Sequence, residues 1–275
     1  MISVHNELTW IASTGMGVVL GFFCLWLVCW LPFAFILAKK LAWQPTKETT
    51  PEQKLPLVLS LYFLAPLALG AIIWLGAGSW LDYGWHWQLE LLISLASGLG
   101  LGLLGISLVF AVELLLGWVK WHSENHSRLY SVVLPILALG LGVGAIEELI
   151  FRGFVFQELS QDYGVVSAAI VSSLIFALLH LLWEQQETLP QLPGLWLMGM
   201  VLVLARLLDG GSLGLAWGLH AGWIVGLTCI DSAALISYTG EGATWITGIG
   251  KQPLAGLAGI ACLLLTAASL ALIFR

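Results

Sequence analysis

Five ionisable side chains lie deep within long apolar stretches of this sequence: Glu147, Glu148, Arg152, His180 and His220. Burying a charge in a bilayer costs at least about 2.5 kcal/mol, so a charged residue inside a membrane span marks a functional site by default. Carboxylates and imidazoles are also groups that commonly transfer protons in catalysis. These residues therefore predict a catalytic or proton-handling site inside the membrane.

The helical spacing of the first three residues assigns them different partners. Glu148 and Arg152 stand four positions apart with the acid first, the order that favours an ion pair on one helix face. Glu147 points about 100° away from Glu148, and its own neighbour four positions on is Phe151. Unless another helix supplies a polar group, Glu147 is a buried carboxyl without a charge partner, and it is the predicted general base.

Two histidines on different predicted spans are the candidate partners of Glu147. His180 follows Phe176 by one helical turn, so the aromatic ring and the imidazole share a face. His220 stands about 200° from a glycine stripe on the same span, and Trp223 follows it one turn later. A lone buried histidine is more often a packing residue, but two of them beside a buried Glu-Glu-x-x-x-Arg cluster favour a functional site.

The composition places these residues in a membrane protein. Of the 275 residues, 59% are hydrophobic and 9% are charged, against roughly 25% charged in a soluble domain. No stretch outside the apolar runs is long enough to build the core of a separate soluble domain. The net charge of −6 and the lack of a basic patch exclude a nucleic-acid partner.

The apolar runs predict an all-α integral membrane protein with about eight transmembrane helices around an intramembrane polar chamber. The predicted spans are 9–38, 55–77, 88–119, 131–157, 165–183, 194–208, 212–229 and 254–274. We expect residues 1–54 to form an N-terminal anchor helix and a polar linker, and residues 55–275 to form a multi-span domain. The core of that domain, at about 131–229, contains the five ionisable residues.

Three glycine stripes repeat every four residues and predict close helix packing. They are Gly98 with Gly102, Gly140 with Gly144, and Gly214, Gly218, Gly222 and Gly226. Near a predicted span end, Arg206 and Asp209 stand three positions apart, so we expect them to pair locally.

The cationic residues predict the orientation in the membrane. Seven Lys and Arg residues fall in loops on one side, whereas only Arg275 falls on the other, which places the N-terminus outside the cytoplasm. Tryptophans at predicted span ends, Trp183 among them, are expected at the headgroup level. The first residues lack the basic residues of a signal peptide, so the anchor is expected to be retained. A multi-pass protein of this kind suits a bacterial inner (plasma) membrane.

The order and spacing of three motifs resemble a known family. Glu147-Glu148-Leu149-Ile150-Phe151-Arg152-Gly153, Phe176-x-x-x-His180 and His220 are similar to the pattern of the CPBP intramembrane proteases. That family includes the type II CAAX prenyl endopeptidases and bacteriocin-immunity or Abi proteins. The resemblance covers about 135–223, and the N-terminal third matches only as generic membrane helices.

The resemblance implies an endopeptidase at or in the bilayer. Glu147 and His180 would activate water together, and His220 would stabilise the oxyanion, while Glu148, Arg152 and Phe176 would support them. The implied substrate is a membrane-embedded or lipid-modified peptide, with prenylated CAAX tails as the family example.

One position departs from the family pattern. Asn commonly follows the third-motif histidine by four residues, whereas this chain has Ile224, and its two asparagines lie outside the predicted spans. Loss of an oxyanion donor costs about 10²- to 10³-fold in rate in other enzymes. Three interpretations stay open: Trp223 supplies the donor, His220 acts alone, or the protein is a weakly active or inactive scaffold or regulator.

Two further alternatives differ in chemistry. Glu147, His180 and His220 form a two-histidine, one-carboxylate set that could hold zinc. Glu148 would then have to act as the base while tied to Arg152, so we favour a mechanism that requires no cofactor. A proton-coupled transporter would also bury such groups, but the sequence lacks the inverted repeats typical of that class.

Overall fold

The computed structural model describes residues 14–43, 50–76, 78–182 and 185–274. The start of the predicted anchor, the middle of the polar linker and Trp183 lie outside these ranges. The long helices are α2 (Gly15–Lys40), α3 (Pro51–Trp74), α4 (Leu89–Leu115), α5 (His126–Glu148), α6 (Phe156–Leu179), α8 (Leu192–Leu208), α9 (Gly214–Ser232) and α11 (Leu257–Ile273). Within the described ranges these eight helices fall on the eight predicted spans, so the all-α fold class is confirmed.

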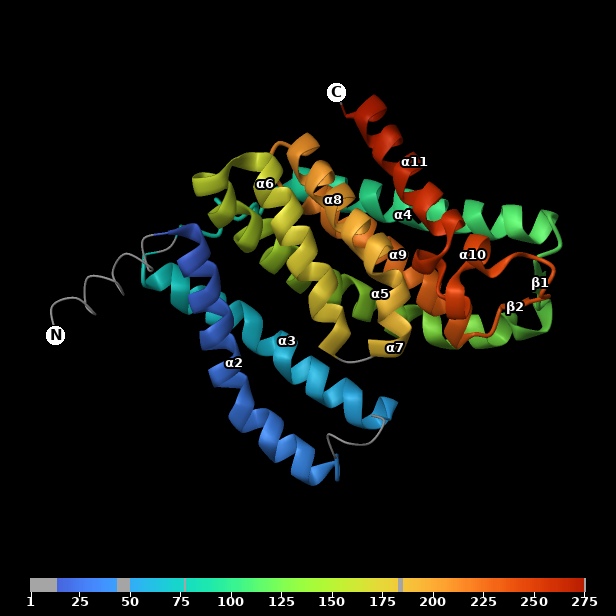
Figure 1. Ribbon diagram of the computed structural model, residues 1–275, viewed down its shortest axis with the longest axis horizontal. Coiled ribbons are helices and arrows are strands. Elements are labelled where there is room, and N and C mark those ends of the chain that lie inside the picture. Colours follow the sequence, from blue (N-terminus) through green and yellow to red (C-terminus); the bar gives the residue numbers. More distant parts are fainter. Residues whose placement is uncertain (1–13, 44–49, 77, 183–184, 275) are drawn as a thin grey trace, which may run out of the picture.

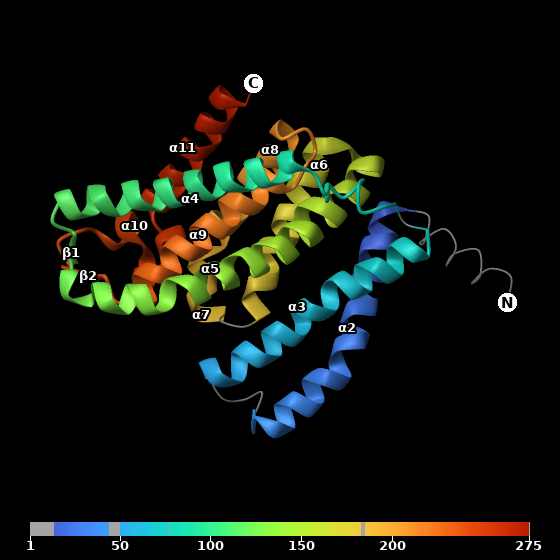
Figure 2. The ribbon, with the colours of Figure 1, turned by 180° about the vertical axis from the view of Figure 1, so that it is seen from behind.

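The remaining elements are short and join the long helices. They comprise α7 (Gln185–Thr188), α10 (Thr244–Thr247), single 3₁₀ turns, and the strands β1 (Val119–Trp121) and β2 (Ile236–Tyr238). The strands pair antiparallel, with Lys120 opposite Ser237. Figures 1 and 2 show α2 and α3 side by side against one flank of a bundle formed by the other long helices, and the strand pair at the far end.

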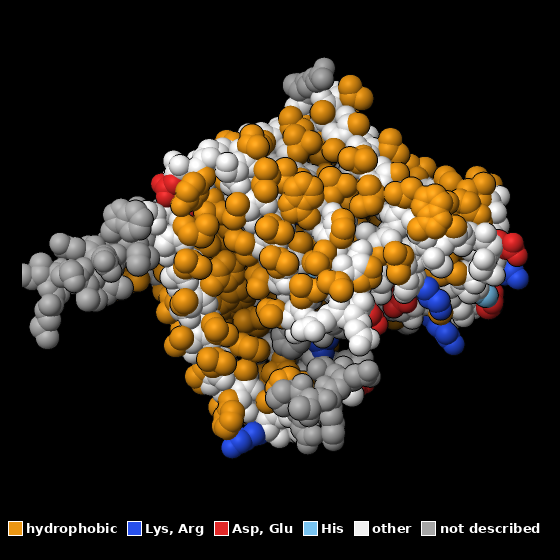
Figure 3. Space-filling model, viewed as in Figure 1, with side chains coloured by type: hydrophobic (Ala, Val, Ile, Leu, Met, Phe, Trp, Pro, Cys, Tyr) orange, Lys and Arg blue, Asp and Glu red, His pale blue; other side chains and the backbone are white. Residues whose placement is uncertain are grey.

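The helix surfaces have the character expected in a bilayer. Five helical runs in the described ranges are long and apolar enough to cross a membrane: Gly15–Lys40, Glu52–Trp74, Leu89–Leu115, Ser123–Leu182 and Gln185–Leu208. On the face drawn in Figure 3, hydrophobic side chains cover most of the surface and charged side chains gather at its margins. Exposed leucines and phenylalanines are stable in such positions because lipid, not water, is their solvent.

Helix α9 lies in the interior, where it packs against α4, α5 and α8. The glycine stripes make this contact close, as the sequence predicted. A Cβ added at Gly218 would lie 2.1 Å from the carbonyl oxygen of Leu95, and one added at Gly98 would lie 2.3 Å from that of Leu215. The α4 and α9 backbones therefore touch, and the seam positions His220 on the opposite face of α9.

Substituting alanine in this seam is expected to destabilise the fold. Gly218→Ala forces the α4 and α9 backbones apart, so the free energy of unfolding should fall by about 2 kcal/mol. Gly100→Ala on α4 is the matched control, because nothing lies within 4 Å of the Cβ it would add. Thermal unfolding in detergent measures both variants, and equal midpoints for the two would contradict the seam.

The helical segment that joins α5 to α6 has a wider turn than an α-helix, next to the buried charged residues. Residues Leu149–Val155 form a π-helix directly after the two glutamates, and such turns are frequent at functional sites. Arg206 of α8, which is 3% exposed, donates hydrogen bonds to the carbonyl oxygens of Arg152 and of Gly153, the latter at 3.1 Å. Arg206 thus binds backbone oxygens of the widened turn.

The expected local pair between Arg206 and Asp209 is wrong. Arg206 also donates to the carbonyl oxygen of Asp82 at 2.9 Å, so it joins three segments that are distant in the sequence. The Asp209 carboxylate instead accepts hydrogen bonds from the Ser94 hydroxyl at 2.6 Å and the backbone N–H of Leu215 at 3.1 Å. Both residues are held by tertiary contacts that a three-residue spacing does not reveal.

Candidate active site

Three helices and the π-helix bring polar side chains to one buried place. Glu147 and Glu148 come from the end of α5, Arg152 from the π-helix, His220 from α9 and Tyr62 from α3. Glu147 is 6% exposed, and Glu148, Arg152 and His220 are 3% exposed or less. The structure therefore gathers four of the five predicted ionisable residues in the bundle interior.

Glu148 is the centre of this cluster. Its Oε1 accepts a hydrogen bond from Arg152 Nη1 at 3.0 Å, which confirms the predicted ion pair. The same Oε1 lies 2.7 Å from His220 Nδ1. Because a carboxylate only accepts, Nδ1 carries the proton of this bond. Glu148 thereby fixes the orientation of the imidazole, as carboxylates commonly do for catalytic histidines.

Glu147 has two partners on other helices. Its Oε1 accepts a hydrogen bond from the Tyr62 hydroxyl, and its Oε2 lies 3.5 Å from His220 Nε2. The polar group that the sequence required from another helix is therefore Tyr62, together with His220. Since Glu148 holds Nδ1, the Nε2 side of the imidazole faces Glu147.

Sequence reasoning missed Tyr62, which belongs to the N-terminal part that matched only as generic membrane helices. A signal was present, because tyrosines in membrane proteins prefer the headgroup level, whereas Tyr62 lies in the middle of an apolar span. A phenolic hydroxyl at that depth needs a hydrogen-bond partner. The identity of the partner follows only from the packing of α3 near α5.

Phe176 is the packing centre that separates the two histidines. Its ring is fully buried, and the Arg152 guanidinium stacks over it at 4.2 Å. Ring centroids lie 4.7 Å from His180 and 5.9 Å from His220. This placement supports the expectation that Phe176 shapes the site.

His180 stands beside this cluster without bonding to Glu147. Its Nδ1 donates to the carbonyl oxygen of Phe176 at 2.8 Å, so Nε2 is the nitrogen left for chemistry. Among the described residues, the ion pairs of Glu147 involve His220 and not His180. A catalytic role for His180 stays a prediction. In that role, His180 would contact Glu147 through a water molecule held between the two side chains.

Trp223 is buried, and its role as an oxyanion donor stays a prediction. The ring is 4% exposed and its Nε1 has no hydrogen-bond partner in the described part of the chain. It lines a small cavity of about 40 Å³ with Ile106, Met198 and Leu263, and no candidate catalytic residue lines that cavity. Ile224, at the position where the family has Asn, points toward Gly140.

The predicted zinc ligands do not assemble. In the described ranges, no three His, Cys, Asp or Glu side chains are grouped as they would be around a metal ion. Glu147 and His220 are neighbours, whereas among the described residues His180 makes no ion pair with Glu147. As they stand in the structure, these three side chains are not grouped as zinc ligands, and a mechanism that requires no metal stays the prediction.

Fold and site together define an all-helical membrane protein with a buried carboxylate–imidazole centre. Residues 128–225 match the family model described as Type II CAAX prenyl endopeptidase Rce1-like. The matched segment contains all three motifs, and it agrees with the predicted family for this part of the chain. Comparison with curated proteins and with solved structures gave no match.

Proposed function

We propose that this protein is an intramembrane endopeptidase that hydrolyses a peptide bond of a membrane-embedded or lipid-modified substrate, with prenylated CAAX tails as the first class to test. The observation that carries the proposal is the buried Glu147 carboxylate, whose Oε2 faces His220 Nε2 at 3.5 Å. A carboxylate held there, away from bulk water, can take a proton from a bound water molecule.

In the proposed mechanism, Glu147 accepts a proton from water that His180 helps to hold. The resulting hydroxide attacks the scissile carbonyl carbon, and the negative charge passes to the carbonyl oxygen. When the C–N bond breaks, the Glu147 carboxyl gives its proton to the leaving amine. Nothing else is consumed, so the products are the two peptide fragments.

Two donors would stabilise the oxyanion. His220 would donate from Nε2 as an imidazolium while Nδ1–H stays bonded to Glu148. Tyr62 would provide the second donor, because its hydroxyl lies at Glu147 and can turn its one O–H from that carboxyl to the oxyanion once Glu147 has taken the proton of water. The Ile224 side chain has no polar group. Arg152 would act indirectly, by holding Glu148 and through it the imidazole.

Removing the Tyr62 hydroxyl is expected to slow catalysis without altering the fold. Tyr62→Phe keeps the ring but removes one oxyanion donor, so kcat should fall about 10²-fold with KM nearly unchanged. Tyr130→Phe is the control, because that tyrosine lies exposed on α5. Steady-state cleavage of a model peptide measures both, and an unaltered kcat for Tyr62→Phe would remove Tyr62 from the mechanism.

The proposal is tested with purified protein in lipid nanodiscs and paired peptides that differ only in a prenyl group on the CAAX cysteine. Mass spectrometry should detect the released C-terminal tripeptide from the prenylated peptide. Binding of that peptide without any cleavage would favour the scaffold or regulator instead. Elemental analysis of protein prepared without chelator should find no stoichiometric zinc, and one zinc per chain would contradict the metal-free mechanism.

The cellular setting is also part of the proposal. The cationic loops support an N-terminus outside the cytoplasm in a bacterial inner membrane. Labelling of single cysteines from either side of intact cells tests this orientation.

A further inference from the structure

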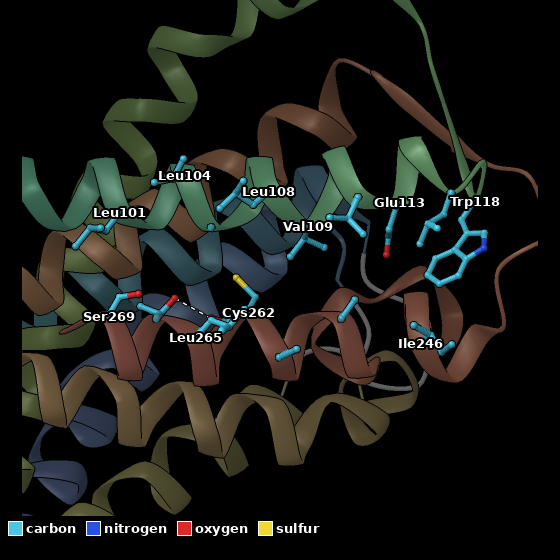
Figure 4. A pocket seen from close by; sticks show the side chains of 16 residues that line it. Leu101, Leu104, Leu108, Val109, Glu113, Trp118, Ile246, Cys262, Leu265 and Ser269 are labelled. Atoms are coloured by element: carbon cyan, nitrogen blue, oxygen red, sulfur yellow. Dashed lines mark hydrogen bonds between the residues drawn. The ribbon is translucent and has the colours of Figure 1, made fainter. Parts of the chain in front are cut away.

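A groove distinct from the candidate active site opens between α4 and α11. It encloses about 410 Å³, within the range of small-molecule sites. Its α4 wall runs from Leu101 to Glu113 and its α11 wall from Ala258 to Ser269, and Figure 4 shows their side chains facing one another. No candidate catalytic residue lines the groove, so its function is separate from peptide hydrolysis.

Glu113 is the one charged residue among those that line this groove. Its side chain is 2% exposed and extends from α4 into the gap (Figure 4). In the described part of the chain, its Oε2 has no hydrogen-bond partner. The Thr266 hydroxyl, which lies opposite Gly105 farther along the groove, is satisfied by the carbonyl oxygen of Cys262 at 2.9 Å. A buried carboxylate without a partner is costly, and a cation from outside the chain that pairs with Glu113 would remove that cost.

The position of Glu113 along α4 sets the depth of the groove in the membrane. Helix α4 has 27 residues and is thus about 40 Å long, whereas the hydrocarbon core is about 30 Å thick. Glu113 is two residues from the C-terminal end of α4, and Trp118 lines the same end of the groove (Figure 4). Indole rings prefer the headgroup level. Glu113 therefore lies near the headgroups, and the apolar length of the groove lies at the depth of acyl chains.

A second polar group stands near the same end. Burial and the negative charge of Glu113 raise the pKa of Tyr238, on β2, to about 12. Tyr238 consequently keeps its proton at physiological pH. No Lys or Arg lines the groove to neutralise the carboxylate or to attract a phosphate.

We propose that the groove binds one acyl chain of a membrane lipid whose headgroup carries a primary ammonium, which donates a hydrogen bond to the Glu113 carboxylate. The apolar walls accept the chain, and the ammonium supplies both the positive charge and the N–H groups that Glu113 lacks. A headgroup with only negative charge is repelled by Glu113. A trimethylammonium headgroup has the charge but no N–H to donate.

Lipid retention by the purified protein tests this site. The full chain is incorporated into vesicles of equal parts phosphatidylethanolamine, phosphatidylcholine and phosphatidylglycerol, extracted gently, and its bound lipids are quantified by mass spectrometry. Wild type should retain phosphatidylethanolamine above its share in the vesicle. Glu113→Gln should lower that retention about tenfold, the effect of losing a charged hydrogen bond.

Matched variants separate the groove from general lipid contact. Glu90→Gln, an exposed glutamate at the other end of α4, should retain the lipid as wild type does. Ala261→Phe, which fills the groove from α11, should lose it. Equal retention of the three lipids by wild type, or undiminished retention by Glu113→Gln, would overturn the proposal. If Glu113→Gln does not fold, the test rests on wild type and Ala261→Phe. Wild type that retains no more phosphatidylethanolamine than phosphatidylcholine would then overturn the proposal.

Discussion

Replacing Glu147 by glutamine is expected to lower kcat for peptide cleavage about 10³-fold, within the range that a general base contributes. Glutamine has the shape of glutamate and can still accept the Tyr62 hydrogen bond through its carbonyl oxygen. It cannot take a proton from water, so the chemical step fails while substrate binding persists. KM should therefore change little, because the lost interaction belongs to the transition state.

The control for this variant is Glu90→Gln, the same chemical change at an exposed position. Its kcat should equal that of wild type, and both variants should unfold at the wild-type temperature. A folded Glu147→Gln protein with near wild-type kcat would show that another group activates the water. Glu148 would then be the next candidate, although Arg152 and His220 already bind it.

Removing Arg152 is expected to cost about 4 kcal/mol of unfolding free energy, as for other buried ion pairs that lose one partner. Arg152→Met leaves the Glu148 carboxylate buried with His220 as its remaining partner. It also removes the guanidinium that stacks on Phe176 at 4.2 Å. Arg128→Met, an exposed position on α5, is the control and should leave the stability unchanged.

A double variant distinguishes the electrostatic cost from a packing cost. Glu148→Gln with Arg152→Met removes both charges, so most of the lost stability should return. Activity should stay low, because glutamine does not hold the His220 imidazole as a charged carboxylate does. If the double variant is less stable than Arg152→Met alone, the ion pair is not the source of the loss. Denaturant titration of the purified proteins measures each free energy.

The parts of the fold that the sequence predicted are those that depend on local periodicity. Apolar run lengths located the eight long helices, and the four-residue glycine register located the α4–α9 seam, where Gly98 meets Leu215. The Glu148–Arg152 pair followed from its four-residue spacing, since one helical turn brings such residues together.

The parts that the sequence did not predict depend on contacts between distant segments. Tyr62 reaches Glu147 across 85 positions, and Arg206 reaches the π-helix carbonyl of Gly153 across 53. Contacts between residues so far apart in the sequence cannot be predicted from the spacing of residues along one helix. Arg206 was expected to pair with Asp209, because Asp209 is the acidic residue within one helical turn of it.

The most direct test of the central claim, that Glu147 drives peptide hydrolysis in the membrane, compares membrane peptides from cells that carry wild type, Glu147→Gln or Glu90→Gln at equal protein levels. Quantitative mass spectrometry of C-terminal fragments is the measurement. The proposed mechanism predicts a set of truncated peptides that is present with wild type and Glu90→Gln and replaced by the full-length forms with Glu147→Gln. The same peptide pattern in all three strains would contradict it.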